Sequence, residues 1–178
     1  MREKFWAMYE NIKYSERYFF YYREQAWRRD RYIKIFLCIA SLSSVTSLAL
    51  WHKAPFIWTI ITVVAQVLSA IAYLIPYSEQ VTALNNLLPE MDQLLHRIDY
   101  DWDRINILQA LSDEEINTLV LKYNAEFTNL ENRFTQGIQF APSKSCVKKA
   151  QEDCEKYKFS RFGITQTDYL EETLRNAR

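Results

Sequence analysis

The sequence reads IFLCIASLSSVTSLALW from Ile35 to Trp51 and APFIWTIITVVAQVLSAIAYLIPYS from Ala54 to Ser78, with only His52 and Lys53 between the two runs. Neither run contains a charged residue. A helix rises about 1.5 Å per residue and needs roughly 17–25 apolar residues to cross a bilayer, and both runs have that length. We therefore predict a two-pass transmembrane helical hairpin. Its predicted extent is 33–77, with spans at 33–51 and 55–76. The alternative, two buried helices of a soluble bundle, fits less well because such helices are usually shorter and carry charge on a solvated face.

The rest of the chain is polar, and its size limits the kind of protein. Of 178 residues, 22 are Lys or Arg and 22 are Asp or Glu, so the formal charge is balanced. This length has room for the hairpin and one modest helical unit, but not for a full catalytic domain. We predict an all-α fold in four parts. These are an aromatic and basic amphipathic helix (1–32), the membrane hairpin (33–77), a coiled-coil-like cytoplasmic hairpin (78–135) and short C-terminal helices (136–178).

Positive charge beside the apolar runs predicts the orientation in the membrane. Arg28, Arg29, Arg31 and Lys34 precede the first run, whereas the loop between the runs offers only Lys53 and one histidine. Because cytoplasmic flanks are enriched in Lys and Arg, the N-terminal side is expected in the cytoplasm, and two passes return the C-terminus there. In that reducing compartment the cysteines are expected to be free thiols.

The first 32 residues are rich in aromatic rings interspersed with arginine. Rings with a polar edge favour the headgroup region, so we expect this helix to lie on the inner leaflet and then turn into the first span. The residues predicted at the membrane interface are Trp27, Arg28, Arg29, Arg31 and Tyr32. The alternative is that the rings pack against neighbouring subunits, since Tyr and Trp are also enriched at protein interfaces.

Polar side chains in the second run recur at steps of three and four residues, which places them on one stripe of a helix. They are Thr59, Thr62, Gln66, Ser69 and Tyr73, and the hydroxyls of the first run include Ser44 and Ser47. An unpartnered amide in hydrocarbon costs several kcal/mol, so Gln66 should face another helix or water. Two interpretations stay open: interhelical hydrogen bonds that hold the hairpin or an oligomer together, or the lining of a pore built from several copies. Both predict a homo-oligomer.

Two heptad patterns follow the membrane hairpin and predict helices that assemble. The first seam contains Leu84, Leu88, Met91, Leu95, Ile98 and Trp102, and the second contains Ile116, Val120, Tyr123, Phe127, Leu130 and Phe134. Between them, Ser112 and Glu115 have the spacing of a capping box. Two such helices with a short link form an antiparallel hairpin or extend the bundle of a multimer.

In the C-terminal region the sequence predicts a loop and two short helices. The loop covers Thr135–Ser145, and Ser143 or Ser145 is expected to cap a basic and acidic helix that reaches about Lys158. A final helix is expected at Asp168–Asn176. The lysines of this region are interleaved with acidic residues, so a solvated helix face is expected and direct contact with nucleic acid is not.

No catalytic signature is present in the sequence, and no cofactor or metal site is expected. With two glycines in the chain there is no glycine-rich phosphate loop, and no zinc helix or nucleophile elbow occurs. Asp99, Asp101 and Asp103 alternate as in a calcium loop, but the turn glycine and terminal glutamate of such a loop are absent. We interpret these carboxylates as a solvated helix face, and the protein as a non-enzyme.

The order of these parts resembles the SLATT family of two-transmembrane effectors in bacterial conflict systems. The resemblance covers about residues 15–110 and rests on the lead-in Tyr18–Tyr32, the hairpin Ile33–Tyr77 and the helix opening Ser78-Glu79-Gln80-Val81. It implies an antiviral defence effector, a pore-forming toxin that oligomerises and permeabilises the inner membrane when a cytosolic sensor detects phage. The sensors implied by the family are nucleotide synthases and retron reverse transcriptase complexes. The tail beyond Gly137 has no counterpart in the family pattern.

A different class of function uses the same parts. A non-toxic membrane anchor or scaffold would recruit a soluble partner through the heptad helices, and the two spans would act only as a tether. A transporter is less well supported because no charged residue lies within either run to couple an ion.

Overall fold

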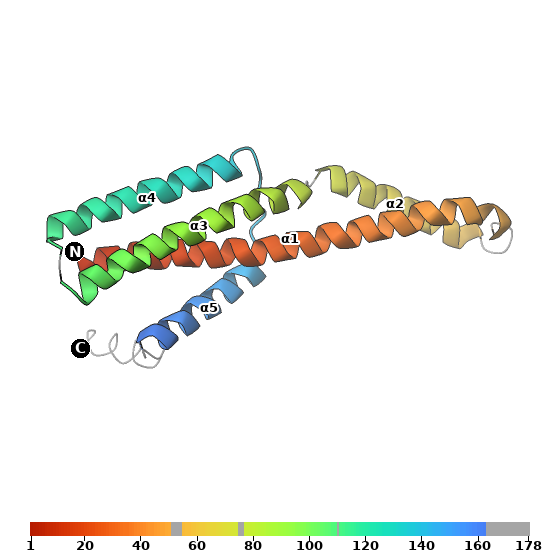
Figure 1. The fold of residues 1–178 in the computed structure, drawn as a ribbon. Helices are drawn as coiled ribbons and strands as arrows, with labels where there is room; N and C mark the ends of the chain where they lie inside the picture. Colours follow the sequence, from red (N-terminus) through yellow and green to blue (C-terminus); the bar gives the residue numbers. More distant parts are fainter. Residues whose placement is uncertain (51–54, 75–76, 110, 163–178) are drawn as a thin grey trace, which may run out of the picture. The chain divides into compact units, whose positions relative to one another are not determined.

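The computed structural model describes residues 1–50, 55–74, 77–109 and 111–162. The described chain is all-helical, as predicted. Its helices are α1 (Arg2–Leu50), α2 (Pro55–Leu74), α3 (Tyr77–Asn106), α4 (Asp113–Thr135) and α5 (Lys144–Phe162) (Figure 1). Contacts divide the chain into two units. Unit 1 comprises Met1–Tyr22 and the chain from Leu84 onward, and unit 2 comprises Arg23–Ala83.

Several predicted features lie outside the described residues. They are the loop residues His52 and Lys53, Pro76 at the end of the second run, and the final helix Asp168–Asn176. For Ser44, Ser47, Thr62 and Tyr73 the backbone is helical but the side chains are likewise outside the description.

Helix α1 is continuous and contributes to both units. The predicted turn between a surface helix ending at residue 32 and a span starting at residue 33 is wrong, because α1 runs unbroken from Arg2 to Leu50. No proline or glycine occurs before Pro55, so nothing in this stretch ends a helix.

The N-terminal turns of α1 form the core of unit 1. Phe5, Tyr9 and Ile12 are fully buried, together with large apolar side chains of α3. The ring of Phe5 stacks on Trp102 at a centroid distance of 6.0 Å and meets Tyr123 of α4 edge-on at 6.3 Å. Both expectations for these rings, the membrane surface and a neighbouring subunit, are therefore wrong for Phe5 and Tyr9, because the chain's own helices cover them.

Helices α3 and α4 form an antiparallel hairpin, as one of the two sequence interpretations predicted. Ion pairs link Glu90 to Arg133 at 3.9 Å and Arg97 to Glu126 at 3.0 Å, so later residues of α3 meet earlier residues of α4. All six seam residues of α3, Leu84, Leu88, Met91, Leu95, Ile98 and Trp102, are buried within the single chain. The seam predicted for oligomerisation is thus occupied by α1 and α4. A heptad pattern predicts that one face of a helix is covered, but it does not identify the helix that covers this face.

The predicted capping box begins α4. The hydroxyl of Ser112 accepts from the backbone N–H of Glu115, and the Glu115 carboxylate accepts from the backbone N–H of Ser112 at 2.8 Å. The Ser112 hydroxyl also donates to this carboxylate at 2.9 Å, and the two hydrogen bonds that the carboxylate accepts, from the Ser112 backbone and hydroxyl, lower the pKa of Glu115. The capping box provides hydrogen-bond acceptors for backbone N–H groups that have no partner within the first turn of a helix.

The segment from 136 to 143 leads from α4 to α5 and packs on α1. Gly137 adopts φ +79°, a conformation that favours glycine, and Phe140 contacts the rings of Phe19 and Tyr22. The hydroxyl of Ser143 then accepts from the backbone N–H of Cys146 at 3.4 Å, so Ser143 is the cap of α5. The helix extends beyond the predicted end at Lys158, to Phe162.

Helix α5 presents a row of small side chains to the rest of unit 1. Cys146, Ala150 and Cys154 follow at steps of four residues, and all three are buried. Both cysteines are free thiols. Because the buried row contains only small side chains, α5 can pack close to the neighbouring helices. The stability of this contact therefore depends more on close packing than on the amount of apolar surface that is buried.

Enlarging Ala150 is expected to disturb this contact. Ala150 has no exposed surface, so Ala150→Leu adds a side chain where there is no space and should cost about 1–3 kcal/mol. Chemical denaturation monitored by circular dichroism measures the loss. Lys148→Leu adds an apolar side chain to the exposed side of the same helix, and equal destabilisation by both variants would contradict the packing argument.

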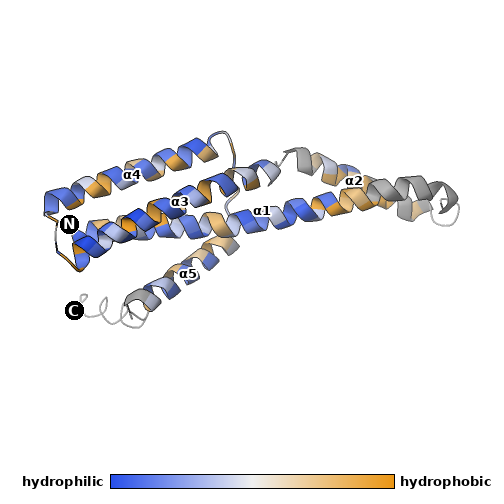
Figure 2. Cartoon of the chain, viewed as in Figure 1, coloured by the Kyte–Doolittle hydropathy of each residue, from blue (hydrophilic) through white to orange (hydrophobic). Residues whose placement is uncertain are grey.

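Unit 2 contains the C-terminal part of α1 and the whole of α2, which lie alongside each other (Figure 1). Along α1 the hydropathy changes from hydrophilic to hydrophobic before the grey end of the helix (Figure 2). Within the residues that the structure describes, no helix combines the length and apolar character that a membrane crossing requires.

Candidate functional site

Three members of the polar stripe predicted on α2 have side chains that the structure describes. Thr59, Gln66 and Ser69 are exposed. Ile61, Ala65 and Leu68, which are separated by steps of four and three residues, are partly covered and form the inward face. Gln66 and Ser69 therefore lie outside the inward face of α2.

The predicted interface residues are exposed on α1. The exposed set includes Trp27, Arg28, Arg29, Arg31 and Tyr32. The guanidinium of Arg31 lies over the Trp27 ring, 5.2 Å from its centroid. A cation in that position is attracted by the electron-rich ring face, which fixes the two side chains as a pair.

The structure also contains a partly buried polar network that sequence analysis missed. Tyr9 donates a hydrogen bond to the Asp99 carboxylate at 2.7 Å, and its hydroxyl lies 2.6 Å from that of Tyr157. The Tyr157 hydroxyl also lies 3.5 Å from the same carboxylate oxygen, and either phenol can donate in the bond between the two hydroxyls. Three helices, α1, α3 and α5, meet at these three side chains. Their separation along the chain leaves no local signal in the sequence.

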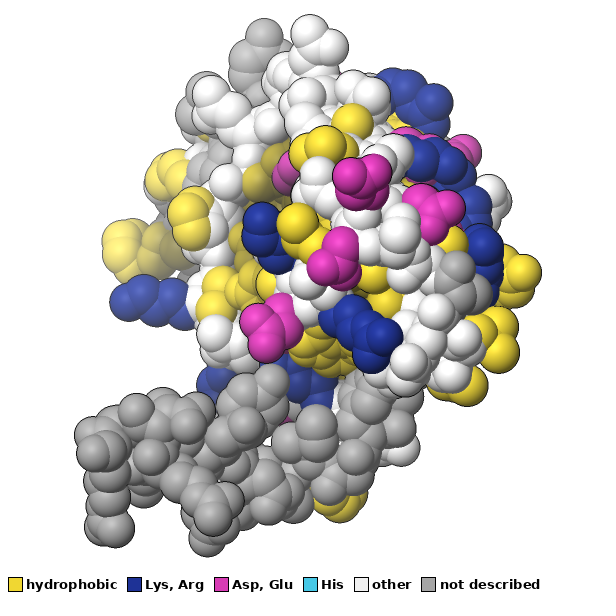
Figure 3. Space-filling view, turned by 90° about the vertical axis from the view of Figure 1, so that its left-hand side faces the viewer, with side chains coloured by type: hydrophobic (Ala, Val, Ile, Leu, Met, Phe, Trp, Pro, Cys, Tyr) yellow, Lys and Arg dark blue, Asp and Glu magenta, His cyan; other side chains and the backbone are white. Residues whose placement is uncertain are grey.

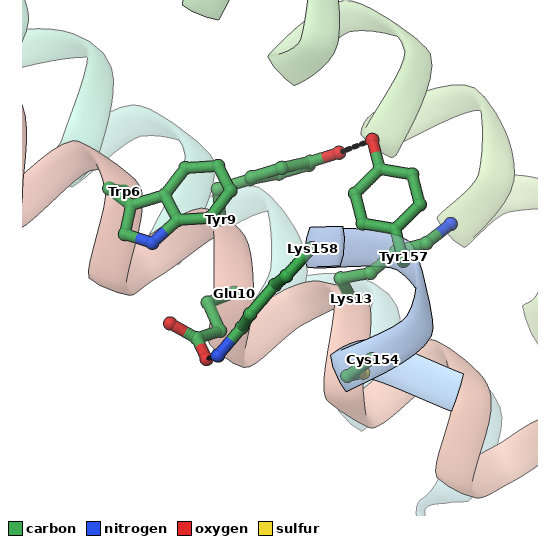
Figure 4. A pocket seen from close by; sticks show the side chains of 7 residues that line it. All are labelled: Trp6, Tyr9, Glu10, Lys13, Cys154, Tyr157 and Lys158. Carbon is green, nitrogen blue, oxygen red and sulfur yellow. Dashed lines mark hydrogen bonds and ion pairs between the residues drawn. The ribbon is translucent and has the colours of Figure 1, made fainter. Parts of the chain in front are cut away.

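A small pocket opens beside this network (Figure 4). Its lining residues are Trp6, Tyr9, Glu10, Lys13, Cys154, Tyr157 and Lys158. Lys158 of α5 forms an ion pair with Glu10 of α1, and Lys13 lies 3.5 Å from Glu16 and over the Tyr157 ring. Burial raises the pKa of the Cys154 thiol, which keeps it protonated and a poor nucleophile. The ion pair between Lys158 and Glu10 and the contact of Lys13 with the Tyr157 ring hold α5 against α1 at this pocket.

A second phenol and carboxylate pair holds α3 to α4. Tyr123 donates to Asp101 at 2.7 Å, and Arg104 contacts the same carboxylate at 3.1 Å. Asp101 is buried, so the interpretation of the alternating aspartates as a solvated face is wrong for Asp101, and Asp99 is engaged by Tyr9. A pattern of alternating carboxylates does not reveal that tyrosines distant in sequence point at them.

These tyrosines are expected to make folding stability fall in alkaline solution. Burial, with the hydrogen bonds to Tyr157 and Asp99, raises the pKa of Tyr9, and burial with the bond to Asp101 raises the pKa of Tyr123. Above about pH 10 the unfolded chain loses these phenolic protons first, so stability that is complete below that pH declines as the pH rises.

The expected slope is about 1.4 kcal/mol per pH unit for each phenol that ionises only on unfolding. Denaturation curves measured between about pH 8 and pH 11 test this, because the ordinary tyrosine pKa is about 10. Tyr9→Phe combined with Tyr123→Phe should flatten the decline, with Tyr100→Phe, an exposed tyrosine, as the matched control. An unchanged slope in the double variant would contradict the argument.

The face of the molecule drawn in Figure 3 has mixed chemistry. On the face shown in Figure 3, acidic and basic side chains are interspersed with apolar ones, and neither sign of charge forms one field. In the part of the chain that the structure describes, no three His, Cys, Asp or Glu side chains converge to hold a metal ion.

The comparisons with known proteins leave the family open. No family model matches the chain, and neither a curated protein nor a solved structure matches it significantly.

Proposed function

We propose that this protein is a membrane effector of a bacterial anti-phage system. It oligomerises and permeabilises the inner membrane when a cytosolic sensor, such as a nucleotide-signalling enzyme or a retron reverse transcriptase complex, releases or activates it, so the chain without its sensor is expected to be active. The resemblance of residues 15–110 to the SLATT family supports the biological setting. The surface of unit 2 supports the physical mechanism.

The observation on which the proposal rests is the apolar surface of unit 2. Phe56 is 76 % exposed and Ile39 is 62 % exposed. Ile35, Ile60, Val63, Val64 and Val67 are exposed as well. Phe56, Ile60, Val63 and Val67 recur at steps of four and three residues, so these exposed apolar side chains share one side of α2. Apolar surface of this kind indicates a site covered by lipid or by another protein. Both apolar runs lack charge over their full length, which favours lipid.

The polar stripe adds a reason for assembly. Gln66 and Ser69 share the exposed side of α2 with these apolar residues. Surrounded by acyl chains alone, the Gln66 amide would lack hydrogen-bond partners, so in a bilayer the stripe turns toward other copies of the chain. Two helices cannot enclose water, whereas several hairpins with their stripes facing inward can.

Unit 1 supplies the cytoplasmic part of the effector. Its heptad seam is buried within the chain, so copies assemble through unit 2 rather than through α3. Helix α1 belongs to both units without a break, so a movement imposed on its N-terminal turns by a sensor passes along one continuous helix.

Reconstituted vesicles test this proposal. The full chain, inserted into vesicles that contain a self-quenching dye, should release the dye, and Gln66→Leu combined with Ser69→Leu should abolish release. Val63→Leu with Val67→Leu, two exposed apolar positions on the same helix, is the matched control and should release dye like the wild type.

Failure of this test has a defined meaning. If the chain resists carbonate extraction from membranes but releases no dye under any condition, it is an anchor, and the effector proposal fails. If it remains dispersed in buffer without detergent, membrane residence fails too.

A further inference from the structure

The region of α1 just before the apolar residues Ile35 and Ile39 has an unusual distribution of charge. From Trp27 to Lys34 every side chain is exposed except those of Asp30 and Ile33. The exposed residues are Trp27, Arg28, Arg29, Arg31, Tyr32 and Lys34, and we refer to them as the belt. The belt therefore contains four cations and two rings, and no acidic side chain.

Neighbouring acids leave the positive charge of the belt in excess. Asp30 lies 2.7 Å from Lys34, and Glu24 lies 3.6 Å from Arg28. Arg31 is drawn onto the Trp27 ring rather than to a carboxylate. Four cations face two acids, so the segment from Glu24 to Lys34 keeps a net positive charge on its exposed side.

The belt is long enough to span the headgroup layer of a membrane and to reach beyond it on either side. Eight residues of helix extend about 12 Å at 1.5 Å per residue, and each polar layer of a bilayer is roughly 5–8 Å thick. Exposed Ile35 and Ile39 follow at once toward the C-terminus. The amphipathic rings of Trp27 and Tyr32 suit the boundary between polar and apolar layers.

We infer that the belt binds the phosphates of anionic glycerophospholipids, with Arg28 and Arg29 as the main contacts and Trp27 and Tyr32 at the level of the headgroups. This inference rests on the proposed membrane residence and names the lipid that the protein prefers. Arginine suits the role because its planar guanidinium donates two parallel hydrogen bonds to one phosphate.

Native mass spectrometry of the full chain in detergent tests the inference. Phosphatidylglycerol should bind at least tenfold more tightly than phosphatidylcholine. Each basic residue near an anionic surface is worth about fivefold in affinity, so Arg28→Gln with Arg29→Gln should weaken phosphatidylglycerol binding roughly 25-fold. Lys144→Gln with Lys148→Gln, at exposed positions of α5, removes the same charge and should leave binding unchanged.

Two outcomes would overturn the inference. Equal binding of both lipids, or equal loss in the control, shows no headgroup site at the belt. Competition by inorganic phosphate as strong as that by the lipid shows a soluble phosphate ligand instead. Either result leaves dye release unaffected, so the lipid preference and the effector mechanism fail independently.

Discussion

Induced expression of this chain in growing bacteria is expected to collapse the membrane potential and stop growth, with viable counts falling by orders of magnitude. Gln66→Leu combined with Ser69→Leu should restore both. Leucine is compatible with lipid and with a helix, so the variant still inserts, but it cannot hydrogen-bond water along the stripe. A potential-sensitive dye and colony counts measure the two effects.

Control variants separate loss of function from loss of protein. Val63→Leu with Val67→Leu should remain toxic, and immunoblots of the membrane fraction should show equal amounts of all three forms. If the wild type is harmless in phage-infected as well as in uninfected cells, the effector proposal is wrong. If the double leucine variant stays toxic at equal abundance, the polar stripe is not the path of permeation.

The second large effect is expected in the core of unit 1. Ile98 of α3 is fully buried. Ile98→Ala removes apolar contacts and leaves a cavity, which should cost about 2–5 kcal/mol. The free energy of unfolding of a small domain is about 5–15 kcal/mol, so this loss is a large part of it. The thermal unfolding transition of unit 1 should therefore move to a markedly lower temperature.

Leu121→Ala on α4 is the matched control for the core variant. Leu121 is 63 % exposed, so its truncation should change stability by no more than about 0.5 kcal/mol. Circular dichroism at the helix band measures both transitions. Equal effects of the two variants would show that α3 is not buried as the structure places it.

Much of the fold follows from short-range patterns. The capping box at Ser112, the cap at Ser143 and the seam along α3 are all found where the sequence predicted them. Each depends on residues within a few positions of one another, and such neighbours are in contact in any helical conformation. The continuity of α1 was also readable from the absence of helix breakers before Pro55, although the prediction placed a turn there.

The arrangement of the candidate site was harder to predict from the sequence. The sequence singled out Gln66 and its stripe because of the spacing, but the spacing did not show whether the stripe faces inward or outward. The same holds for the rings of the first helix, where Trp27 and Tyr32 are exposed and Phe5 and Tyr9 are buried. Composition does not distinguish a ring that meets lipid from one that fills a core.

Near neighbours along the chain were sufficient to predict an all-helical fold, the caps at Ser112 and Ser143 and the charge-free runs, but not every helix boundary. Which helix faces pack against each other was decided only by the tertiary structure. Tyr9 reaches an aspartate 90 residues away and a tyrosine 148 residues away, and α5 brings its small side chains against helices far earlier in the chain. These contacts form because several helices bury their side chains against one another. The periodicity of one helix shows which of its faces is buried, but it does not show which other helix covers that face.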